Sequence, residues 1–137
     1  MKVTVIDGHG GLMGAQIIKE ILSRFQNVQI TAIGTNSAAT AAMLKAGVKE
    51  AATGENPVVV ACRKTDVIIG PVGIVIADSM LGEVTPKMAV AVGQADAVRI
   101  LIPMNRCENL VAGVKGFNMS VLIEDAMAKL QEITAAK

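Results

Sequence analysis

The first segment of the sequence that suggests chemistry is a glycine-rich stretch after a β-branched run near the N-terminus. Residues 3–6 are Val-Thr-Val-Ile, and residues 8–14 are Gly-His-Gly-Gly-Leu-Met-Gly. Glycines at a strand-to-helix turn let backbone N–H groups approach a phosphate, and the following helix N-terminus favours an anion. The spacing is GxGxxxG, one residue longer than the dinucleotide fingerprint GxGxxG. The segment predicts a phosphate or nucleotide site, and a tight turn without a ligand is the alternative.

A second segment of small polar residues, Gly34-Thr35-Asn36-Ser37, follows the β-branched run at residues 28–33. An NAD-binding fold places an acidic residue near this point to bind the ribose, and none of these four residues is acidic. No arginine stands beside them to hold a 2′-phosphate. If a dinucleotide binds, NADP is favoured over NAD, because hydroxyl and amide groups do not repel a phosphate. The same four residues form either an anion nest or an ordinary helix cap.

Two later strand ends have a similar composition. Gly70 and Gly73 belong to a Gly-Pro-Val-Gly segment, and Asn105 follows the apolar run at residues 98–102. Ligands of open α/β sheets bind beyond the carboxyl ends of the strands, so the coincidence of several such ends is more informative than one motif. The segment around Gly70 and Gly73 has an alternative role as a sharp turn that leaves the sheet.

A few side chains near these segments could act on a ligand. His9, the only histidine, either transfers protons or contacts a phosphate, or is an exposed loop residue. Asp7 either orients a ribose or a cation, or caps the turn by accepting hydrogen bonds from backbone N–H groups. Asp78 and Glu83 lie in an irregular stretch that could act as a lid, and solvated loop carboxylates are the alternative.

The composition excludes several classes of function. Of the 137 residues, 52% are apolar and 18% are charged, and the net charge is +1. These values exclude a disordered chain and a strongly basic nucleic-acid-binding domain. One histidine and two distant cysteines, Cys62 and Cys107, encode no metal site. The longest apolar run, residues 67–77, is shorter than the roughly 20 residues of a membrane span, so we expect a cytoplasmic protein with no membrane partner. The near-neutral net charge leads us to expect no nucleic-acid partner.

The apolar patterns predict elements that would bring these strand ends together. Short β-branched runs alternate with segments whose apolar residues recur at helical spacing, which indicates an α/β fold with parallel strands and right-handed crossovers. We predict one Rossmann-like domain over residues 1–137, a three-layer open sheet that is mostly parallel and has about five or six strands. The predicted strands are residues 3–6, 28–33, 50–53, 67–69, 98–102 and 110–114, and the predicted helices are residues 12–25, 38–46, 56–64, 85–95 and 120–135.

Several motifs along nearly the whole chain resemble a small bacterial family of Rossmann-like domains of unknown function. They include Val5-Ile6-Asp7-Gly8-x-Gly10-Gly11, Ala32-Ile33-Gly34-Thr35-Asn36-Ser37, Ile69-Gly70-Pro71-x-Gly73 and Leu101-Ile102-Pro103. This resemblance implies a fold and no activity. Gly34–Ser37 also resembles the Gly-Thr-rich helix start at which methylglyoxal synthase-like domains bind phosphate, and Gly70–Gly73 resembles the later Gly-Pro-x-Gly segment of those domains. Ile74-Val75-Ile76 stands where that family carries its catalytic aspartate, so the resemblance implies binding architecture without the synthase reaction.

Together, these observations predict that the glycine-rich strand ends bind a nucleotide or a phosphorylated small metabolite, with NADP or another nucleotide as the cofactor. Two alternatives stay open: a small enzyme that acts on a phosphorylated metabolite or uses NADP and is completed by oligomerisation, and a structural subunit without a ligand. The low charged fraction also predicts a homo-oligomer. The candidate binding residues are Gly8, His9, Gly10, Gly11, Gly14, Gly34, Thr35, Asn36, Ser37, Gly70, Gly73 and Asn105.

Overall fold

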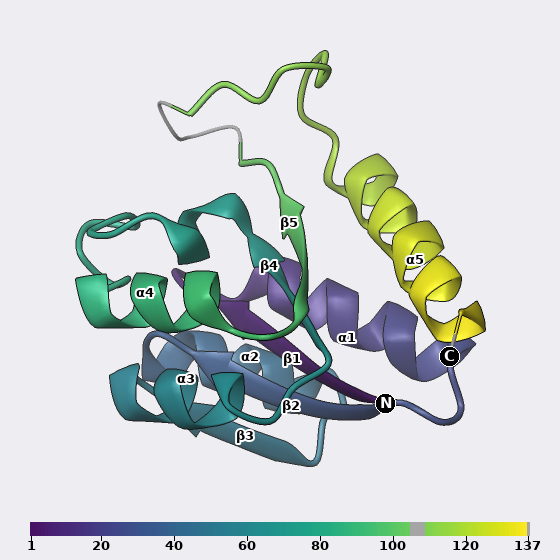
Figure 1. Cartoon of the computed structure of the whole chain (residues 1–137), viewed down its shortest axis with the longest axis horizontal. Coiled ribbons are helices and arrows are strands. Elements are labelled where there is room, and N and C mark those ends of the chain that lie inside the picture. Colours follow the sequence, from purple (N-terminus) through teal and green to yellow (C-terminus); the bar gives the residue numbers. More distant parts are fainter. Residues whose placement is uncertain (105–108, 137) are drawn as a thin grey trace.

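The computed structural model describes residues 1–104 and 109–136, and it contains an open, parallel five-stranded sheet between two layers of helices (Figure 1). The strands are β1 (Lys2–Asp7), β2 (Gln29–Gly34), β3 (Glu50–Thr53), β4 (Val67–Pro71) and β5 (Val98–Ile102). Their order is β3-β2-β1-β4-β5, and every neighbouring pair is parallel. The predicted three-layer α/β sheet is confirmed.

Two hydrophobic clusters hold the helices on the two faces of the sheet. The first cluster joins β-strand residues to α1 (Leu12–Arg24), α2 (Ser37–Lys45) and α5 (Met119–Ala135). The second joins the opposite face to α3 (Glu55–Cys62), the short 3-10 helix η1 (Val72–Val75) and α4 (Pro86–Gln94). Successive residues of a strand face opposite sides, so Val3 and Val5 of β1 enter the first cluster and Ile6 enters the second.

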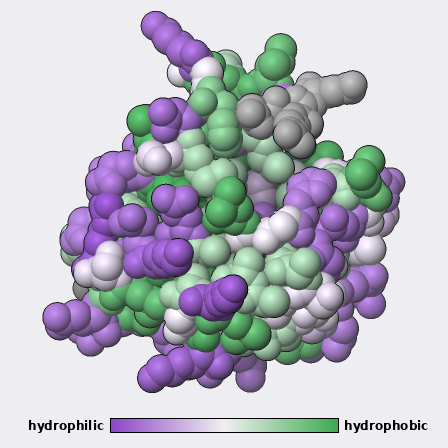
Figure 2. Space-filling model, turned by 180° about the vertical axis from the view of Figure 1, so that it is seen from behind, coloured by the Kyte–Doolittle hydropathy of each residue, from purple (hydrophilic) through white to green (hydrophobic). Residues whose placement is uncertain are grey.

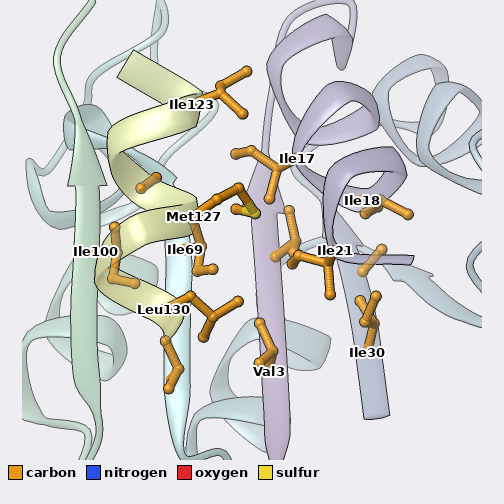
Figure 3. Close-up of a cluster of buried hydrophobic side chains, with 14 of the residues drawn as sticks. Val3, Ile17, Ile18, Ile21, Ile30, Ile69, Ile100, Ile123, Met127 and Leu130 are labelled. Atoms are coloured by element: carbon orange, nitrogen blue, oxygen red, sulfur yellow. The ribbon is translucent and has the colours of Figure 1, made fainter. Parts of the chain in front are cut away.

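The apolar stripe of α1 explains why this helix forms and where it packs. Ile17, Ile18 and Ile21 are fully buried and belong to the first cluster together with Met127 and Leu130 of α5, and Ile17 lies beside Met127 (Figure 3). This spacing of apolar residues is the one predicted from the sequence, because positions three and four apart share one helix face. The packing places the N-terminus of α1 at the carboxyl end of β1.

The predicted sixth strand at residues 110–114 is wrong. Gly113 has a φ of 90°, and Val114 N–H donates to the carbonyl of Val111 at 3.2 Å, so these residues form a turn. Residues 109–118 are exposed and lie past the strand ends in Figure 1. The two β-branched residues suggested a strand, but a glycine with positive φ favours a turn over a strand.

No helix among the described residues is long and apolar enough to cross a membrane.

Candidate functional site

A cavity of about 710 Å³ lies at the carboxyl ends of the strands, beside the loop that joins β1 to α1. Strand order reverses between β1 and β4, and such a switch point is the usual position of a ligand in an open α/β sheet. The lining comes from three parts of the chain: Asp7, Gly8, His9, Gly10, Gly11, Leu12, Met13; then Gly73, Ser79, Met80, Leu81; then Met104, Asn109, Phe117, Met119.

Asp7 occupies part of the helix terminus that an anionic ligand would use. Its two carboxylate oxygens accept hydrogen bonds from Gly8 N–H at 2.8 Å and from Gly14 N–H at 2.7 Å. Burial raises the pKa of the Asp7 carboxyl above its usual value, and the two backbone hydrogen bonds offset only part of that effect. Asp7 therefore accepts hydrogen bonds from backbone N–H groups at the turn before α1 and within its first turn. This is the capping role that the sequence analysis gave as the alternative to a contact with a ribose or a cation.

Three backbone N–H groups at the same terminus remain open to the cavity. Within the described residues, the N–H groups of Gly10, Leu12 and Met13 have no acceptor, and all three residues line the cavity. A Cβ atom added to Gly10 would meet nothing within 4 Å, so the space in front of this residue is empty. The start of α1 thus offers donors and a positive dipole end to a ligand.

The rest of the described lining is largely apolar. None of the described lining residues is a lysine or an arginine, so His9 is the one lining residue able to carry a positive charge. Methionine, leucine and phenylalanine side chains, such as Met13, Met80 and Phe117, form much of the wall. Such walls can contact an apolar or planar ligand body, and the backbone N–H groups can donate to a negatively charged group.

Glu83 connects three loops beside the cavity. Its Oε1 atom accepts hydrogen bonds from Thr35 Oγ1 at 2.6 Å, from Asn36 Nδ2 at 2.8 Å and from His9 N–H at 3.0 Å. Partial burial raises the pKa of Glu83, but these hydrogen bonds outweigh it, so the pKa lies below the usual value of a glutamate. A Cβ atom on Gly8 would come within 2.9 Å of Glu83 Oε1, so only glycine allows this close approach.

His9 is held by both of its backbone groups and by its ring. Its N–H donates to Glu83, its carbonyl accepts from Asn36 Nδ2 at 2.9 Å, and its Nδ1 atom lies 3.7 Å from Glu83 Oε2. Its φ of 51° is in the left-handed region, which non-glycine residues seldom adopt. The side chain is 49% exposed and lines the cavity, so His9 is a fixed residue of the site.

The structure brings only some of the predicted binding residues into the cavity. Gly8, His9, Gly10, Gly11 and Gly73 line it. Thr35 and Asn36 lie at the same sheet edge, where both contact Glu83 and Asn36 also caps α2 by accepting from Ala39 N–H at 2.8 Å.

The remaining predicted residues lie outside the cavity lining. Gly14, Gly34 and Gly70 stand at close contacts in the fold: an added Cβ would come within 2.6 Å of Met43 Sδ, 2.2 Å of Thr40 Oγ1 and 2.3 Å of the Ile6 carbonyl oxygen, respectively. Ser37 is the first residue of α2 and does not line the cavity. Asn105 falls outside the described residues.

Sequence reasoning did not find the partners of Glu83 or the walls formed by residues 79–81 and 117–119. Glu83 is separated from His9 by 74 positions and from Thr35 by 48. In the segment around Glu83, Asp78, Met80 and Leu81 also have positive φ. Because none of these three residues is a glycine, the sequence does not indicate this conformation. The Gly-rich loop before α1 and the Gly-Pro-Val-Gly segment at residues 70–73 carried the local signals for this cavity.

The strand order and the cavity define a parallel α/β fold of the Rossmann type with a candidate ligand site at its switch point. The chain belongs to the family DUF3842, a domain of unknown function, whose family model matches residues 2–135. The resemblance to a family of Rossmann-like domains of unknown function is thereby confirmed. The likeness to methylglyoxal synthase-like domains stays a prediction.

Comparison with other known proteins adds no function. No curated protein matches the chain. A similar solved structure is a dodecameric FMN-dependent Ubix-like decarboxylase from Escherichia coli O157:H7, which has 15% sequence identity and a TM-score of 0.48. The match covers 96% of this chain and 77% of that one. The function of this chain has to be argued from its own site.

Proposed function

We propose that the cavity at the ends of β1 and β4 binds a nucleotide or a phosphorylated small metabolite. The observation that carries this proposal is that the N–H groups of Gly10, Leu12 and Met13, at the start of α1, have no acceptor in the part of the chain that the structure describes. Backbone N–H groups at a helix N-terminus bind phosphate through hydrogen bonds and through the positive end of the helix dipole. Asp7 already takes the Gly14 N–H, so the ligand uses the outer part of the terminus.

The charges around the cavity favour a ligand with one phosphate over one with several. A di- or triphosphate needs lysine, arginine or a metal ion to balance its charge, and the described lining holds no lysine or arginine. The donors of Thr35 and Asn36, which the sequence suggested for a 2′-phosphate, are used by the Glu83 carboxylate. That carboxylate repels a second phosphate, so we propose a monophosphate rather than NADP as the ligand class.

The test is a binding measurement on matched glycine variants. Gly10→Val places a side chain in the empty space before the open N–H groups, whereas Gly93→Val adds the same side chain on α4, away from the cavity. Neither residue has a positive φ or a neighbour within 4 Å of an added Cβ, so both variants are expected to fold. The ligand panel is AMP, FMN, a sugar phosphate, ATP, NAD and NADP.

We expect a monophosphate of this panel to raise the melting temperature of the wild type and of Gly93→Val, and to leave Gly10→Val unchanged. A ligand at 100 times its dissociation constant adds about 2.7 kcal/mol to the free energy of unfolding, which a thermal shift detects. The proposal is wrong if no monophosphate of the panel stabilises the wild type. It is also wrong if a folded Gly10→Val protein binds with unchanged affinity.

A further inference from the structure

The backbone of His9 is held in an unfavourable conformation by contacts on both of its sides. Its φ is 51°, and its two backbone polar groups are bound by Glu83 and by Asn36. Non-glycine residues in this region cost free energy and persist only where the surroundings hold them, often at functional sites. These contacts fix the position of His9 at the cavity.

The ring of His9 is oriented by Glu83. Oε1 of Glu83 is occupied by three donors, so Oε2 is the carboxylate oxygen that faces His9 Nδ1, at 3.7 Å. This separation is an ion-pair distance, longer than a hydrogen bond, and contacts of catalytic groups in ligand-free proteins often tighten only when the ligand binds. A carboxylate at Nδ1 favours the tautomer with the proton on Nδ1, which leaves the lone pair on Nε2.

The surroundings of this pair suit proton transfer. His9 lines the cavity, and within residues 1–104 and 109–136 the carboxylates that interact with it are those of Glu83 and Asp7. Both oxygens of Asp7 already accept backbone hydrogen bonds, so Asp7 is not free to orient the imidazole. Glu83 is therefore the group that orients His9.

We propose that His9 is a proton-transfer residue that acts on the ligand bound in this cavity, and that Glu83 is its positioning residue. The proposal rests on the proposed function for its substrate, a phosphorylated metabolite. Nε2 of His9 accepts a proton from an acidic O–H or C–H group of the ligand, and the ring becomes an imidazolium stabilised by the Glu83 carboxylate. The same proton then returns from Nε2 to another atom of the ligand, so the reaction class is an isomerisation that consumes no co-reactant.

The test of the pair is the tautomer of the neutral His9 ring, and it requires no ligand. His9 is the only histidine, so nitrogen-15 NMR of the labelled protein at pH 8 reports one imidazole. We expect the wild type to carry the proton on Nδ1. In Glu83→Gln the carbonyl oxygen of the new side chain continues to accept the three hydrogen bonds that Oε1 accepts in the wild type. The NH₂ group of the new side chain then faces Nδ1 and donates to it, so the ring proton moves to Nε2. Asp78→Asn, a change of another carboxylate in the same loop, is the matched control and should keep the wild-type tautomer.

A second readout measures the reactivity of Nε2. Diethyl pyrocarbonate modifies an unprotonated imidazole nitrogen, and we expect the wild type and Asp78→Asn to react several-fold faster than Glu83→Gln at pH 8. Glu83→Ala, which offers neither an acceptor nor a donor to the ring, should lose the preference for the Nδ1–H tautomer. The proposal is overturned if the wild-type proton resides on Nε2, or if Glu83→Gln changes neither tautomer nor rate. Because no ligand enters either measurement, failure of phosphate binding would not produce these outcomes.

Discussion

Asp7 and Glu83 are two carboxylates beside the same cavity whose pKa values move in opposite directions because their surroundings differ. Asp7 is buried at the end of β1, and burial raises its pKa despite two backbone hydrogen bonds. Glu83 lies in a more open position, where burial also raises its pKa but hydrogen bonds from Thr35, Asn36 and His9 outweigh it. Glu83 therefore stabilises the fold in its ionised form, whereas the ionisation of Asp7 opposes folding.

The lowered pKa of Glu83 gives a stability difference that depends on pH. A lowered pKa in the folded state adds stability that is present above the unfolded value, about 4.3 for a glutamate, and is lost as the pH falls through the folded value. We expect wild-type protein to be more stable than Glu83→Gln at pH 7 and to lose this advantage below about pH 4. Urea unfolding of both proteins from pH 7 to pH 3 measures the difference.

Comparison of these two proteins cancels most of the contribution of Asp7, because both contain it and the Glu83 charge is the smallest of the influences on its pKa. A raised pKa has the opposite sign: its contribution is present below the unfolded value of an aspartate and declines as the pH rises. Asp78→Asn serves as the control, since it changes another carboxylate of the same loop and leaves the three hydrogen bonds to Glu83 in place. A Glu83→Gln difference that is equally large at pH 7 and pH 3 would contradict the role assigned to this carboxylate.

At the scale of secondary-structure elements, the predictions from sequence succeeded where the signal was local. The helix from Leu12 and the strand Val67–Pro71 were found because apolar spacing and the β-branched run at residues 67–69 are signals that act within a few residues. Residues 110–114 also contain β-branched side chains, yet they form a turn, because Gly113 adopts a positive φ and no strand of the sheet pairs with them. Sequence alone could not show that β5 is the edge strand of the sheet.

In the candidate site, too, the residues with a local sequence signal were predicted and the contacts between distant loops were not. The glycines of residues 8–11 could be assigned because a strand, a turn and a helix follow one another there. The link from Glu83 to His9 could not, because it depends on two loops that only the folded sheet brings together. Asp78 and Leu81 add to the difficulty, since both adopt a left-handed conformation without being glycine. The glycine spacing therefore predicted that the N-terminus of α1 lies at the site, but it did not predict that Glu83 orients His9.

The packing of α5 gives a prediction at the scale of an element. Leu130 is fully buried against the first cluster, which also includes Val3 and Ile21 (Figure 3). We expect Leu130→Ala to lower the free energy of unfolding by about 2–5 kcal/mol, because it removes buried methyl groups and leaves a cavity. Denaturant unfolding measures the change, and the exposed neighbour Gln131→Ala is the control, with an expected effect within about 0.5 kcal/mol. Equal effects of the two substitutions would contradict the packing described for α5.

At the scale of the whole molecule, large apolar side chains are exposed at the end that carries the cavity. Leu81 is 100% exposed and Leu12 is 68% exposed, and both line the cavity. Leu110 is 97% exposed and belongs to the connection that supplies Phe117 to the lining. Figure 2 shows hydrophobic surface among hydrophilic side chains on the back of the molecule, including its upper end. Clustered apolar surface of this kind marks interaction sites in soluble proteins.

We therefore propose that copies of this chain associate through the cavity end, and we expect a homo-oligomer at micromolar protein concentration. A twofold dimer is the commonest arrangement, and it would bury the same patch on both copies. The double variant Leu81→Ser, Leu110→Ser should lower the mass measured by light scattering toward that of a monomer, because it removes the two most exposed leucines. The control, Leu44→Ser, Val60→Ser, changes two apolar residues that are each 47% exposed and lie on α2 and α3, away from the cavity. A wild-type monomer, or dissociation of the control but not of the cavity variant, would show that this end is not the interface.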